Sequence, residues 1–71
     1  MELVVLSSDS KTENGCDRMI LAGDRVAVQG VSVLGHPDFA SVSVPAGETL
    51  NAVSVRTFLE AARELERRLQ A

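Results

Sequence analysis

Apolar residues alternate with polar ones through the first two thirds of the chain and change to a helical spacing near Ala46. A period of two is typical of strands, whereas a period of about 3.6 is typical of an amphipathic helix. The pattern therefore predicts an α+β fold, in which a small antiparallel sheet of three to four strands, arranged as two hairpins, packs against one C-terminal amphipathic helix. We expect a single small domain over residues 1–71, with the sheet in about 2–45 and the helix in about 50–70.

The first half of the chain contains the segments that are expected to begin the sheet. Leu3–Leu6 is apolar without alternation, which favours a central strand covered on both faces. Ser7–Gly15 is polar and ends in an Asn-Gly pair that favours a tight turn, so we expect a loop there. Arg18–Leu21 and Arg25–Gln29 flank a short segment that contains Gly23-Asp24. This arrangement predicts a β-hairpin.

The valine pattern changes phase at Gly30. Val28 and Val31 cannot share a face of one regular strand, because successive side chains point to opposite faces. A glycine at this point predicts a β-bulge or, alternatively, two short strands joined at Gly30. After an expected turn at Gly35–Asp38, Phe39–Val44 alternates cleanly and predicts a further strand.

The C-terminal third has the spacing of a helix that lies on a sheet. Its apolar positions are Leu50, Val53, Phe58, Leu59, Ala62, Leu65 and Leu69. Thr49 and Ser54 are the candidate residues to cap the start of this helix. Two ion pairs are expected on its exposed face, Glu60 with Arg63 and Glu64 with Arg68. The stripe from Phe58 to Leu69 is expected to pack on the sheet, and the alternative is a dimer interface.

Charge narrows the class of partner. The formal net charge is −3, and the negative charge is concentrated in the half that is expected to form the sheet. Phosphate is repelled by such a surface, so we expect no direct binding of nucleic acid and favour a protein partner with a basic surface. Partner contacts are predicted through charged residues on turns and on the helix, together with strand addition at a sheet edge. The candidate partner-binding residues are Asp17, Asp24, Asp38, Glu48, Arg56 and Arg63.

Candidate catalytic and ligand-binding groups are sparse. Cys16 and His36 are the single cysteine and the single histidine, and neither lies in a nucleophile motif, so we predict no enzyme. One cysteine and one histidine are too few for a metal site, and the glycines form no phosphate-binding cluster, so no metal or cofactor is expected. We expect Asp38 to hydrogen-bond the local backbone rather than orient the imidazole of His36.

The sequence also bears on location in the cell. A lone cysteine fits a reducing compartment, and the sequence contains no signal-peptide pattern and no stretch of apolar residues that is long enough to span a membrane. We therefore expect a cytoplasmic protein that does not bind membranes.

One family resemblance rests on four short segments. Ser7–Ser10 reads Ser-Ser-Asp-Ser, Cys16 follows, Val26–Val28 reads Val-Ala-Val, and Val55–Leu59 reads Val-Arg-Thr-Phe-Leu. In this order they resemble a small actinobacterial domain of unknown function that is encoded beside helix-turn-helix regulators. Asp9 stands where that family has an aromatic residue. The resemblance implies a partner-binding accessory of a transcription regulator, with no catalytic residues.

These observations favour a non-enzymatic protein-interaction module. The leading hypothesis is an acidic accessory or inhibitor that binds a regulator or a nucleic-acid-handling protein. One alternative is a phage-type inhibitor such as an anti-CRISPR protein. Another is a structural module that dimerises through its C-terminal helix, and the least favoured is an enzyme that uses Cys16 as its nucleophile.

Overall fold

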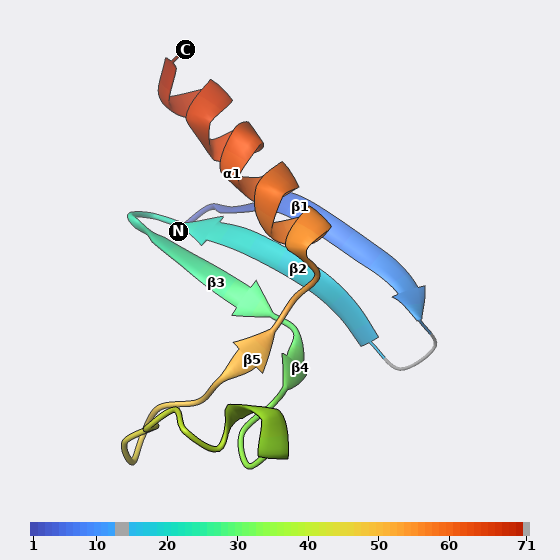
Figure 1. The fold of residues 1–71 in the computed structure, drawn as a ribbon. Coiled ribbons are helices and arrows are strands. Elements are labelled where there is room, and N and C mark those ends of the chain that lie inside the picture. The colour runs from blue at the N-terminus through green and yellow to red at the C-terminus, as the bar shows by residue number, and fades with distance from the viewer. Residues whose placement is uncertain (13–14, 71) are drawn as a thin grey trace.

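A three-stranded antiparallel sheet with one helix across its face forms most of the molecule (Figure 1). This computed structural model describes residues 1–12 and 15–70, and it describes side chains outside 10–16. The sheet has the order β1-β2-β3, formed by β1 (Leu3–Thr12), β2 (Gly15–Ala22) and β3 (Arg25–Gln29). Helix α1 (Val55–Gln70) packs mainly on β1 and β2. The predicted α+β fold, with two hairpins and a C-terminal helix, is confirmed.

The position of the first strand differs from the prediction. Leu3–Leu6 belongs to β1, which is an edge strand, and β2 is the central strand because it pairs with both neighbours. The expected loop over Ser7–Gly15 is also wrong for most of its length, because the strand continues to Thr12 and pairs again at Gly15. The tight turn expected at Asn14 lies outside the described residues.

The hairpin of β2 and β3 is confirmed, with a regular register from Arg18 opposite Gln29 to Ala22 opposite Arg25. Gly23 is the first residue of the two-residue turn and has a φ of 64°. Glycine at that position is characteristic of the type II′ turn, whose twist matches the twist of the two strands.

A bulge in β1 brings two neighbouring residues into the interior. The register passes from Val5 opposite Ile20 to Ser7 opposite Met19, which leaves Leu6 as the extra residue. Leu6 and Ser7 are each only 8% exposed. Leu6 joins the apolar core with Met19, while the hydroxyl of Ser7 faces the helix. The bulge therefore supplies a core side chain and a polar anchor from adjacent positions.

The chain breaks at Gly30, as one of the two alternatives predicted. Strand β3 ends at Gln29, and β4 (Val31–Ser32) starts a second, two-stranded sheet with β5 (Asn51–Ala52). Residue 30 passes so close to β5 that any Cβ atom there would overlap the carbonyl oxygen of Ala52. Close approach of two backbones thus requires glycine.

Residues 33–50 form a small lobe below the main sheet in Figure 1, closed at its base by β4 and β5. The strand predicted over Phe39–Val44 is wrong, because the chain forms the 3-10 helix η1 (Pro37–Phe39) followed by turns. Proline fixes the backbone for the first turn of a helix. Amide hydrogen bonds from Phe39 to His36 and from Val42 to Phe39 then keep the chain coiled.

The helix begins later than predicted, at Val55 rather than near residue 50. Asn51 and Ala52 pair with β4 and are therefore extended. Of the two candidate caps, Ser54 is the one that acts, because its Oγ accepts the amide hydrogen of Thr57 at 3.0 Å. On the helix, Thr57 and Ala61 are fully buried against the sheet.

The close approach at Gly30 gives a prediction for stability. Changing Gly30→Ala should lower the free energy of unfolding by about 2 kcal/mol, because the methyl group forces β4 and β5 apart. Urea denaturation measures the change. Gly47→Ala is the matched control, since Gly47 has a φ of 89° and open space around it, so that only backbone strain of about 1 kcal/mol is expected. Equal losses for the two variants would contradict the steric explanation.

Candidate protein-binding surfaces

The predicted partner-binding residue Asp17 is used inside the fold. Its Oδ2 accepts the amide hydrogen of Ser54 at 2.8 Å, directly before the first turn of α1. A carboxylate at this end of a helix satisfies a free amide and also interacts favourably with the helix dipole. Asp17 is partly buried, so it is a structural residue and not a free recognition charge.

The other predicted acidic residues are exposed but do not form one surface. Asp24 lies in the turn between β2 and β3, which is at the other end of β3 from the lobe (Figure 1). Asp38 lies on η1 and Glu48 lies on the turn that leads to β5. The structure therefore separates Asp24 from the two acidic residues of the lobe.

Of the two predicted binding residues on the helix, Arg56 forms an ion pair within α1, whereas Arg63 is exposed. Arg56 donates to Glu60 at 2.9 Å, so the expected pair of Glu60 with Arg63 is wrong, whereas Glu64 and Arg68 do lie within 3.6 Å. The hydrogen bond to Glu60 raises the pKa of Arg56, and the hydrogen bond from Arg67 lowers the pKa of Glu64. Such surface pairs fix side-chain positions more than they add stability.

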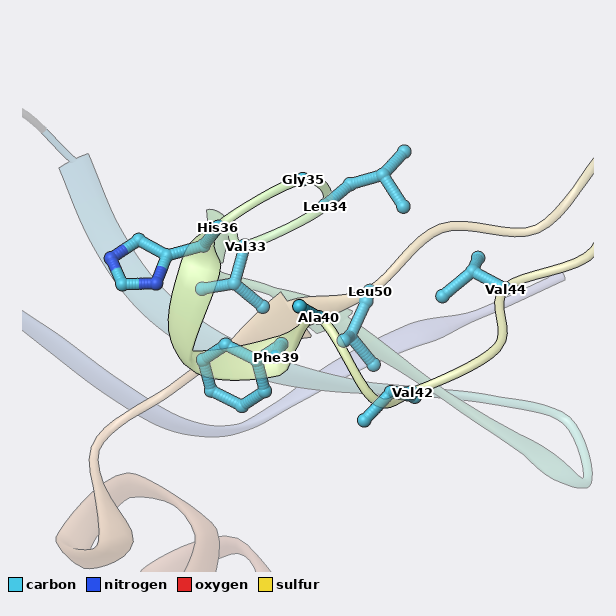
Figure 2. Close-up of a pocket in the computed structure, with 9 residues that line it drawn as sticks. All are labelled: Val33, Leu34, Gly35, His36, Phe39, Ala40, Val42, Val44 and Leu50. Carbon is cyan, nitrogen blue, oxygen red and sulfur yellow. The ribbon is translucent and has the colours of Figure 1, made fainter.

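An open hollow occupies the lobe, with a volume of about 280 Å³ and a surface that is polar as well as apolar (Figure 2). Its lining residues are Val33, Leu34, Gly35, His36, Phe39, Ala40, Val42, Val44 and Leu50. The volume is slightly below the range of about 300–1,000 Å³ that is typical of pockets for drug-sized ligands. The hollow therefore has the size for one or two side chains of a protein.

The charges around this hollow are negative. Between residues 26 and 55 the sequence contains two charged side chains, Asp38 and Glu48, and no lysine or arginine. The side chain of Asp38 is 82% exposed beside the imidazole of His36. A basic side chain on a partner would meet attraction here and no competing cation from the lobe.

The single histidine has a local structural role. Its Nδ1 accepts the amide hydrogen of Asp38 at 3.1 Å, so the imidazole caps η1. We expected the Asp38 side chain to bond the backbone, but the histidine side chain does so instead. The ring also packs edge-on against Phe39, with centroids 6.1 Å apart. The side chain of Cys16, the other half of the rejected catalytic pair, lies outside the described residues.

A second groove, which is apolar and has a volume of about 270 Å³, lies between α1 and the part of the same sheet face that the helix leaves open beside β3. Its lining residues are Leu6, Met19, Val26, Phe58, Ala61, Ala62 and Leu65. Phe58 was expected in the core, but it is half exposed at this groove. Because α1 contacts β1 and β2, Val26 and Val28 of β3 also remain partly open to solvent.

Among the side chains of residues 1–9 and 17–70, no cluster of three or more metal-ligating groups is found. In the same part of the chain, every buried side-chain nitrogen or oxygen has a hydrogen-bond partner. None of the described helices has the length and apolarity needed to cross a membrane.

Comparisons with protein-family models, with curated proteins and with solved structures find no match to this chain. The resemblance to the actinobacterial domain encoded beside regulators therefore stays a prediction.

Sequence reasoning missed both apolar surfaces. The hollow was not predicted because Phe39–Val44 has the alternation of a strand. The absence of lysine and arginine from residues 26–55, by contrast, can be read from the sequence. The groove was not predicted because we expected the apolar stripe of α1 to face the sheet directly.

The buried role of Asp17 gives a second prediction. Asp17→Ala should lower the free energy of unfolding by about 2 kcal/mol, because a partly buried amide at the start of α1 loses a charged acceptor. Asp24→Ala is the matched control and should change stability by less than about 0.5 kcal/mol, since Asp24 is exposed on a turn. Thermal or urea unfolding followed by circular dichroism measures both. Similar values for the two variants would contradict the structural role of Asp17.

Proposed function

We propose that this protein is a non-enzymatic protein-interaction module whose lobe, residues 33–50, binds a partner with a basic and partly apolar surface. The observation that carries the proposal is the open hollow, lined by mostly apolar residues, in a segment whose full charges, Asp38 and Glu48, are both negative. The hollow accepts an apolar side chain, and the carboxylates attract lysine or arginine next to it.

The same features favour a protein over other partners. Phosphate groups are repelled by Asp38 and Glu48, which disfavours direct contact with nucleic acid. Transcription regulators and other nucleic-acid-handling proteins carry basic surfaces, because they must neutralise phosphates. A partner of this class fits the lobe, which then acts as an accessory to it or as an inhibitor that covers its basic surface.

The test starts with affinity capture of the tagged protein from extract of its native host, followed by identification and purification of the captured protein. Its binding is then measured with the native chain and with the lobe variant Asp38→Asn/Glu48→Gln. The control variant, Glu2→Gln/Asp24→Asn, removes two exposed charges outside the lobe and so has the same net charge.

We expect the lobe variant to slow association by about tenfold at low salt and to weaken its salt dependence, because exposed charges act mainly on the association rate. The control variant should stay within about twofold of the native rate. Equal effects of the two variants would mean that net charge alone acts. Unchanged binding of the lobe variant, or capture of no protein, would overturn the proposal.

A further inference from the structure

Helix α1 carries an apolar seam that the protomer covers only in part, mainly at Leu65, which packs against the core. The seam consists of Val55, Phe58, Ala62, Leu65 and Leu69, whose spacing alternates between three and four residues. This is the a/d spacing of a helix that pairs with another helix. Val55 is 74% exposed, Phe58 53% and Leu69 78%, so the seam faces solvent along most of its length.

The way α1 sits on the sheet explains this exposure. The sheet contacts the small residues Thr57 and Ala61, which are fully buried. With a rotation of about 100° per residue, the seam lies about a quarter turn round the helix axis from Thr57 and Ala61. It therefore points sideways along the sheet face and forms one wall of the groove whose other wall includes Val26 of β3.

The surface of the chain is too large for a compact monomer. The protein exposes 5580 Å², whereas a compact monomer of this mass exposes about 4,300 Å². Its radius of gyration is 13.6 Å, against about 11 Å for a compact chain of this length. The excess of about 1,300 Å² is larger than the ~800 Å² that each partner buries in a standard interface. The exposed surface of the protomer is therefore large enough for an interface of standard size.

We infer that a second copy of this chain covers the seam, with the two α1 helices antiparallel about a twofold axis. This direction makes layers in which a and d positions meet. Phe58 of one protomer packs against Leu69 of the other, and Ala62 packs against Leu65. The twofold axis repeats each layer, so the seam is complementary to itself. In each layer a larger residue faces a smaller one.

Charges also select the helix as the surface where two copies meet. Two lobes repel each other, because both carry the negative charges of Asp38 and Glu48. The helix has charges of both signs and is nearly neutral.

The second helix also fills the groove next to the seam. That groove is lined almost entirely by apolar side chains, including Met19 and Val26. An incoming helix can place its own Phe58 there and cover residues that the single α1 leaves open. The dimer surface is separate from the lobe, so each copy in the dimer keeps its hollow available for the partner proposed above.

Sedimentation velocity or light scattering, from roughly 1 to 500 µM protein, tests the inference. The native chain is expected at twice the protomer mass in the upper part of this range. Phe58→Glu and Leu69→Glu should each raise the dissociation constant by at least about 30-fold. Leu34→Glu is the matched control, because Leu34 is an exposed apolar residue of the lobe, and it should remain dimeric.

A size exchange tests the direction of pairing. Ala62→Leu and Leu65→Ala should each weaken the antiparallel dimer by about fivefold, because each unbalances the layer in which Ala62 faces Leu65, and the double variant should restore it. Circular dichroism of every variant checks that α1 still forms. If Phe58→Glu loses helix, Leu69→Glu decides, because Leu69 lies in the last turn and is the more exposed.

A native chain that stays monomeric at the highest concentration would overturn the dimer. A dimer that persists in the Phe58→Glu/Leu69→Glu double variant would overturn the seam. A size exchange that does not restore association would overturn the antiparallel direction. None of these results bears on binding through the lobe, which is measured with a different partner and with variants at Asp38 and Glu48.

Discussion

The attachment of the first turn of α1 to the sheet determines most of the remaining structure. Asp17 of β2 accepts the amide hydrogen of Ser54, and Ser7 of β1 donates to the carbonyl oxygen of Thr57 at 2.9 Å. Hydrogen bonds of this kind require the helix backbone to lie close to the strands, so small side chains must face the sheet. Thr57 and Ala61 fulfil that condition, and the larger apolar residues are turned to the side.

This attachment explains why a helix with a strong apolar stripe leaves part of that stripe in solvent. The pattern of the sequence fixes how wide the stripe is, but it does not fix which edge of the stripe meets the sheet. Polar groups decide the rotation here, because a buried serine hydroxyl and a partly buried carboxylate must keep their partners. The same rotation produces the groove beside β3 and the surface available for a second helix.

The parts of the fold that depend on local sequence could be predicted, and the parts that depend on distant contacts could not. The hairpin at Gly23, the break at Gly30 and the cap at Ser54 follow from short-range backbone preferences. The bulge at Leu6 and the hydrogen bond of Asp17 to Ser54 depend on where α1 begins. The start of α1 lies far from both residues in the sequence. The exposure of the candidate binding residues on turns could be expected from the sequence. The separation of Asp24 from the lobe could not, because it depends on the order of the strands.

The pairing of β4 with β5 gives the lobe a degree of independence from the rest of the chain. These strands, together with the hydrogen bond from the amide of Val33 to the oxygen of Leu50 at 2.9 Å, bring the two ends of the segment together. The entropy of closing a loop grows only slowly with its length. Insertions, deletions and replacements between those ends can therefore alter the surface of the lobe without disturbing the sheet and helix, so the two parts of the chain are able to evolve separately.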